Sequence, residues 1–160
     1  MALQGCGRIA MPTSMGVRPR ARGHSIETVT CSAKSSRLRR RHAYGSQPLP
    51  EELKAIDLPA VRAMGIEAAA RKAIGHLTRE ELDGFFIHLD ADCLDDALMP
   101  AVDFRVPGGL SWNELGTALR IALASGKAVG LEITIYNPRL DGGGEAGRGL
   151  ANVLVAALGC

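Results

Sequence analysis

A short apolar run at residues 85–89 constrains the fold of this chain more than any other feature. Only His88 interrupts the run, and such a segment is typical of a strand buried on both faces, as in a parallel sheet. A second apolar run covers residues 128–136. Between the two runs, Ser111 and Glu114 have the spacing of a capping box and predict the start of a helix. Together these segments predict a strand–helix–strand unit with parallel strands.

Helical patterns flank this unit on both sides. Apolar residues recur at helical spacing in residues 59–76 and again in residues 146–158. The Pro-Glu-Glu at residues 50–52 is typical of a helix start, because acidic side chains favour the first turn. The sequence therefore predicts an α/β fold in the order helix, strand, helix, strand, helix.

The charges divide the chain into two parts. Residues 1–42 contain nine basic side chains and one acidic side chain, whereas residues 43–160 contain ten basic and sixteen acidic ones. The first part is rich in Gly, Pro, Ser and Arg and has no sustained period, so we expect it to be disordered or non-native. An out-of-frame or mis-started reading of a GC-rich gene would have this composition. A basic arm for nucleic acid is the less favoured alternative, because Tyr44 is the one aromatic residue near it.

The composition of the 160 residues suits one packed domain, since 46% are hydrophobic and 22% are charged. No apolar run reaches the roughly 18 residues of a membrane-spanning helix, so we expect no membrane partner. The four cysteines lie far apart and form no C-x-x-C pair. This pattern argues against a disulfide framework and predicts a cytoplasmic protein.

Two aspartates follow the first apolar run directly. Asp90 and Asp92 would point to the same side if the strand extends that far. Ligands of open α/β sheets bind beyond the carboxyl ends of the strands, and two carboxylates placed together there favour a cation. Oxygen ligands favour Mg²⁺, Ca²⁺ or Mn²⁺ over zinc. The alternative is that both aspartates only cap a loop or a helix.

The wider sequence around these aspartates resembles the arginase/agmatinase (ureohydrolase) family. The resemblance begins with His-Leu-Asp-Ala-Asp-Cys-Leu-Asp at residues 88–95. Met-Pro-Ala-Val-Asp at residues 99–103 and Pro-Gly-Gly-Leu-Ser at residues 107–111 follow in the family's order. The second apolar run, from Gly-Leu-Glu-Ile to Tyr-Asn-Pro at residues 130–138, resembles the family's late strand. The resemblance covers about residues 45–160, the C-terminal part of the family domain.

This resemblance implies a partial three-layer fold with a mainly parallel sheet, in which the family's N-terminal strands are missing. It also implies a chemistry, in which a hydroxide between two Mn²⁺ ions attacks the carbon of a guanidino or related C–N bond. By position, Asp90 and Asp92 match the family's last pair of metal-ligating aspartates. The family's other ligand motifs, of the types Gly-Gly-Asp-His and Asp-x-His-x-x-x-Asp, are not intact here. His24 faintly resembles the first motif, and its alternative is an exposed histidine in a basic tail.

The substrate side departs from the family pattern at Ile135. Many members carry a glutamate there that pairs with the guanidinium, and an isoleucine cannot neutralise a buried cation. Glu132 matches a position that is often acidic, and by strand parity it faces away from Ile135. Glu132 and His88 are therefore candidates for contact with the substrate or with the metal ligands. The competing interpretation of His88 is a packed core histidine.

These observations predict a truncated ureohydrolase that is weakly active or inactive as this chain alone. Its expected cofactor is Mn²⁺, its expected substrate is a small guanidino-type compound, and a homo-oligomer is possible. One alternative is a non-enzymatic remnant that associates with another subunit through exposed sheet edges. The other alternative is a basic-tailed module that binds anions or nucleic acid. No catalytic residue is predicted beyond the metal ligands.

Overall fold

A computed structural model describes residues 8–11, 26–32, 54–80, 82–105 and 107–159 of the chain. Five strands form one sheet in the order β3-β1-β2-β4-β5. The strands are β1 (Arg8–Met11), β2 (Ile26–Ser32), β3 (Lys54–Asp57), β4 (Gly84–Asp90) and β5 (Ala128–Thr134). Strand β1 is antiparallel to both β2 and β3, whereas β2, β4 and β5 are parallel to one another. The mainly parallel sheet expected from the sequence is confirmed.

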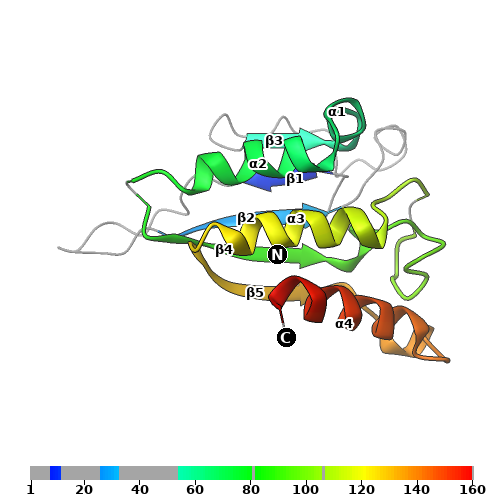
Figure 1. The fold of residues 1–160 in the computed structure, drawn as a ribbon. Coiled ribbons are helices and arrows are strands. Elements are labelled where there is room, and N and C mark those ends of the chain that lie inside the picture. The colour runs from blue at the N-terminus through cyan, green and yellow to red at the C-terminus, as the bar shows by residue number, and fades with distance from the viewer. Residues whose placement is uncertain (1–7, 12–25, 33–53, 81, 106, 160) are drawn as a thin grey trace.

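Four helices accompany the sheet: α1 (Leu58–Met64), α2 (Ile66–Leu77), α3 (Trp112–Ala124) and α4 (Glu145–Leu158). Figure 1 shows α2, α3 and α4 side by side along one face of the sheet. The buried side chains of β4 that face this layer are Phe85, Ile87 and Leu89. They pack with the apolar stripes of the helices, which is the arrangement that the helical periodicity predicts. Among the described residues, no helix is both long and apolar enough to cross a lipid bilayer.

The predicted strand–helix–strand unit is confirmed as β4, α3 and β5. Helix α3 starts with the predicted capping box, in which the Ser111 side chain accepts from the N–H of Glu114 and the Glu114 side chain accepts from the N–H of Ser111. Helix α4 follows at the position expected from residues 146–158. Hydrophobic period and capping signals are therefore sufficient to locate this half of the chain.

The structure differs from the sequence prediction at the helix expected over residues 59–76. Two helices occupy this stretch because Gly65 adopts a φ of 84° and ends α1. Asp57 caps α1 by accepting from the N–H of Ala60, and residues Lys54–Asp57 before it form strand β3. The helix start expected at residues 50–52 lies outside the described residues.

Strands β1 and β2 fall within residues 1–42, where the sequence predicted no regular structure. That prediction is wrong for these two strands, and three strands precede β4 along the chain. The physical reason is visible in β2, whose Ile-Glu-Thr-Val-Thr is rich in β-branched residues that favour strands. The surrounding Gly, Pro and Arg residues hid this short signal. His24 and the rest of the basic segment lie outside the described residues.

Candidate metal and substrate site at the carboxyl ends of β4 and β5

The carboxyl ends of β4 and β5 bring the sequence-predicted residues together. These strands are parallel and adjacent, with His88 opposite Glu132 and Asp90 opposite Thr134. Because side chains alternate along a strand, all four lie on one face of the sheet. That face is opposite the one on which Phe85 and Leu89 pack. The site therefore comes from cross-strand register, which the sequence alone does not contain.

A chain of polar contacts joins the four side chains. The Thr134 hydroxyl donates a hydrogen bond to Oδ1 of Asp90. Nε2 of His88 lies 3.1 Å from the same oxygen and 3.4 Å from the Thr134 hydroxyl. The other ring nitrogen of His88, Nδ1, is in hydrogen-bonding contact with Oε1 of Glu132. His88 thus connects two carboxylates and is not a packed core histidine, which corrects one of the two sequence interpretations.

Asp92 occupies a different element from Asp90. Strand β4 ends at Asp90, and a single 3₁₀ turn, η2 (Ala91–Cys93), follows it. The condition for predicting both side chains on one strand face is therefore not met. Both aspartates are nonetheless buried, with 8% and 6% of their surface exposed for Asp90 and Asp92. Two buried carboxylates so close in the chain need compensating donors or a cation.

The donor chemistry of this edge suits a hard cation, but the number of donors is small. Carboxylate oxygens are the ligands that Mn²⁺ prefers, and such an ion usually takes six ligands. Within the described part of the chain, no group of three or more His, Cys, Asp or Glu side chains could hold a metal ion. The residues described here therefore fit the role of two ligands and do not complete a site.

The loop after Asp92 is held against the site by backbone contacts. The N–H of Leu110 donates to the carbonyl of Cys93 at 2.8 Å, and the N–H of Asp95 donates to the carbonyl of Leu110 at 2.9 Å. Asp95 also accepts from Gly108 and serves the turn, as the sequence suggested. Arg62 of α1 donates to the carbonyl of Gly109 at 2.7 Å. Sequence reasoning missed Arg62 because it lies 47 positions before its partner.

Glu132 and Ile135 end β5 in different ways. The Glu132 side chain is 52% exposed although it contacts His88, so it remains open to a cationic group. Ile135 lies just beyond the strand and has a φ of 72°, which is a strained conformation for a β-branched residue. Strand parity therefore does not relate the two side chains. Ile135 packs partly against the core. Because its side chain is apolar, it offers no charge to a substrate.

Asp141 stabilises the turn between β5 and α4. Its carboxylate accepts from the N–H of Gly147 at 2.8 Å and from the Tyr136 hydroxyl at 2.8 Å. The Gly147 hydrogen bond is the main reason that the pKa of Asp141 lies below its usual value, with Tyr136 adding to the effect. The hydrogen bond that the Tyr136 hydroxyl donates to Asp141 raises the pKa of Tyr136.

This shift predicts an acid-sensitive turn. A carboxylate with a lowered pKa in the folded state stabilises the protein above its unfolded pKa of about 4, and this contribution is lost as pH falls through the folded value. Thermal unfolding followed between neutral pH and pH 3 should therefore show a smaller acid-induced loss in Asp141→Asn than in the wild type. Tyr136→Phe, which keeps the Gly147 hydrogen bond, should retain most of the wild-type pH dependence. Identical acid profiles for Asp141→Asn and the wild type would contradict the assignment.

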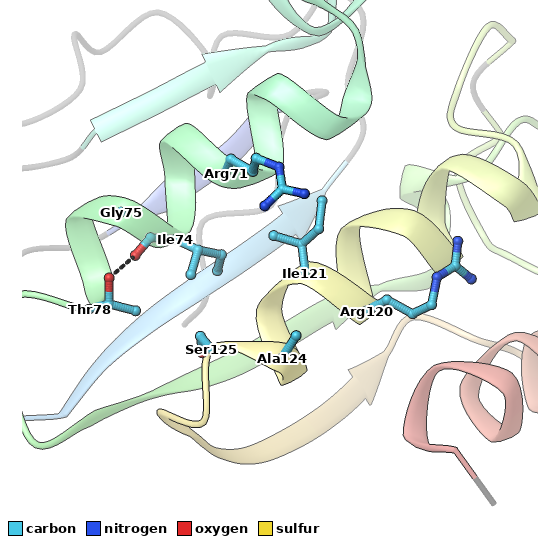
Figure 2. A pocket seen from close by; sticks show the side chains of 8 residues that line it. All are labelled: Arg71, Ile74, Gly75, Thr78, Arg120, Ile121, Ala124 and Ser125. Atoms are coloured by element: carbon cyan, nitrogen blue, oxygen red, sulfur yellow. Dashed lines mark hydrogen bonds between the residues drawn. The ribbon is translucent and has the colours of Figure 1, made fainter.

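A surface groove of about 600 Å³ lies between α2 and α3, away from the aspartates. Figure 2 shows Ile74 and Ile121 between the helices and the Arg71 side chain extending from α2 toward α3; Arg120 also contributes to the lining. Both helices end at this groove, and the strands that follow them begin nearby, so it is near the amino ends of β4 and β5. Arg71 is already paired with Glu67 at 2.8 Å. Ligands of such sheets bind at the opposite, carboxyl end, so this groove is not the candidate site.

Comparison with known proteins identifies the family of this chain. The sequence model of the arginase family matches residues 38–160. The chain belongs to the arginase family. An arginase from Brucella melitensis biotype 1 is 28% identical over 109 residues, which cover 68% of this chain and 35% of that protein. This arginase-family chain therefore spans about a third of the length of the relative it matches.

Solved structures lead to the same family. The crystal structure of arginase from Bacillus subtilis matches with a TM-score of 0.61 and 25% identity, covering 66% of this chain and 36% of that one. Formimidoylglutamase from Bacillus subtilis matches with a TM-score of 0.60 and 28% identity, covering 64% of this chain and 32% of that one. The arginase-like fold expected from the sequence resemblance is confirmed for this part of the chain.

Proposed function

We propose that this chain carries the aspartate pair of a Mn²⁺-dependent hydrolase that acts on the C–N bond of a small guanidino-type compound. The observation that supports the proposal is the placement of Asp90 and Asp92. Both are buried carboxylates at the carboxyl end of β4, in a chain of the arginase family. Ligands of α/β sheets bind at this end, and the donor chemistry suits Mn²⁺.

Each residue has a defined part in this proposal. Asp90 and Asp92 would hold the metal, which when bound supplies a water of lowered pKa at neutral pH. Glu132 offers a half-exposed carboxylate on the same sheet face, where it can pair with the positive charge of a guanidinium. Ile135 carries no charge, so we assign the substrate contact to Glu132. We further propose that the chain alone has little or no activity, because two carboxylates are an incomplete ligand set.

Calorimetric titration of Mn²⁺ into the whole 160-residue chain tests the proposal. The wild type should bind Mn²⁺, and Asp90→Asn combined with Asp92→Asn should weaken the affinity by at least about 10-fold, since each lost carboxylate removes an ionic ligand. Asp96→Asn is the matched control, because Asp96 is a partly exposed carboxylate near Arg105, and its replacement should leave the affinity unchanged. A double variant that binds like the wild type would refute the ligand assignment. Urea release above a metal-free control would refute the proposed inactivity.

A second candidate function is association with a further subunit. Exposed apolar side chains on β5 and α4, including Val129 and Leu158, favour it. A location in the cytoplasm, expected from the scattered cysteines, stays a prediction.

A further inference from the structure

We propose that Thr134 and His88 are positioning residues that hold Asp90 by one carboxylate oxygen, so that its other oxygen is presented to a divalent cation. This inference rests on the proposed function, in which Asp90 is a metal ligand. It assigns a role to Thr134, which no sequence motif singled out, and it gives His88 a task that is distinct from binding the metal.

The evidence is the convergence of two groups on a single atom. The Thr134 hydroxyl donates to Oδ1 of Asp90, and Nε2 of His88 lies 3.1 Å from the same oxygen. Within the described residues, every hydrogen bond to the Asp90 side chain ends on Oδ1. Two partners on one oxygen fix the rotation of the carboxylate about its Cβ–Cγ bond. The second oxygen, Oδ2, is then the one left to coordinate a cation.

The strands themselves supply the precision of this arrangement. Thr134 is the cross-strand partner of Asp90, and Glu132 is the cross-strand partner of His88. Glu132 contacts Nδ1 of the imidazole and thereby sets the orientation of the ring whose Nε2 faces Asp90. Groups that orient a metal ligand in this way typically change metal affinity by about 10–100-fold when they are removed. A carboxylate held from two sides by adjacent strands is well suited to that role.

Replacement of the Thr134 hydroxyl gives the sharpest test. Thr134→Val keeps the β-branched shape and removes the donor, so Mn²⁺ affinity measured by calorimetry on the whole chain should fall by about 10-fold or more. Thr134→Ser restores the hydroxyl and should restore the affinity. Glu132→Gln should weaken Mn²⁺ binding indirectly, and it should move the ¹⁵N resonances of the His88 imidazole in the metal-free protein.

The matched control is Thr78→Val. Thr78 also donates a half-buried hydroxyl hydrogen bond, at 3.1 Å to the carbonyl of Ile74, but it lies at the C-terminal end of α2. Both Thr→Val variants should lower the melting temperature similarly, whereas only Thr134→Val should lose Mn²⁺ affinity. A merely structural role for Thr134 would not separate the two variants.

The outcomes distinguish this inference from the function on which it rests. If Thr134→Val binds Mn²⁺ like the wild type while Asp90→Asn with Asp92→Asn loses binding, the positioning role is overturned and the proposed function stands. If the double aspartate variant binds like the wild type, the proposed function fails and this inference fails with it. Loss of affinity in Thr134→Val with recovery in Thr134→Ser supports both.

Discussion

Gly109→Ala is expected to destabilise the protein by about 3 kcal/mol, because the new methyl group would overlap with backbone. A Cβ at this position would lie 2.4 Å from the carbonyl carbon of Leu94 and 2.5 Å from the amide nitrogen of Asp95. Neither atom can turn away as a flexible side chain can. The loop must therefore separate from the segment that follows Asp92.

The same substitution should also disturb the candidate site. Separation of the loop breaks the hydrogen bonds by which Leu110 holds Cys93 and Asp95. Cys93 ends the 3₁₀ turn that carries Asp92, so Mn²⁺ affinity should fall together with stability. Urea denaturation and Mn²⁺ calorimetry on one sample of each protein measure the two effects.

Gly75→Ala is the matched control for this experiment. Gly75 lies inside α2, and a Cβ there would meet nothing within 4 Å. Alanine in a helix interior is favoured over glycine by about 0.5–1 kcal/mol, so this variant should be slightly more stable than the wild type. Equal unfolding midpoints for Gly109→Ala and Gly75→Ala would show that the close approach at Gly109 is not a constraint.

Local signals in the sequence predict the half of the fold that surrounds the site. The apolar run before Asp90 places β4, and the pair Ser111 and Glu114 places the start of α3 to the residue. These signals are short-range, because the sequence patterns of a buried strand and of a capped helix start each span only a few residues. Gly65 shows their limit, since its positive φ divides a continuous helical pattern into two helices.

The position of the candidate site in the chain could be predicted from the sequence, but the contacts between its side chains could not. Asp90 and Asp92 were identified from their spacing and from the family resemblance. Thr134 was missed because its contact with Asp90 depends on the register between β4 and β5, 44 positions apart in the chain. The condition on which Asp90 and Asp92 would share one strand face is not met, because β4 ends at Asp90, a boundary that depends on where pairing with β5 stops.

Self-association through β5 is the second large effect that the structure predicts. Within the described part of the sheet, β5 is an edge strand whereas its neighbour β4 is paired on both sides. Strands of parallel sheets are normally buried on both faces, yet Val129 and Ile133 of β5 are 56% and 37% exposed. Figure 1 shows α4 beside β5, and its Val155 and Leu158 are also exposed. We call these four side chains the β5–α4 surface.

The occupant that we expect on the β5–α4 surface is a second copy of this chain. Two β5 strands can pair antiparallel about a two-fold axis. That pairing supplies the hydrogen bonds that an open edge lacks. It also buries the apolar side chains of both copies, which favours association.

Ile133→Lys tests this association by placing a charge on the strand that would pair. Light scattering and sedimentation should show a wild-type dimer. The dissociation constant of the variant dimer should be higher by about 10-fold or more, because a central apolar contact becomes a buried charge. Met64→Lys is the matched control, since Met64 is 40% exposed on α1, beside β3 at the other end of the sheet. A monodisperse wild-type monomer would exclude this mode of association, because an edge strand that pairs with its own copy cannot remain solitary at high concentration.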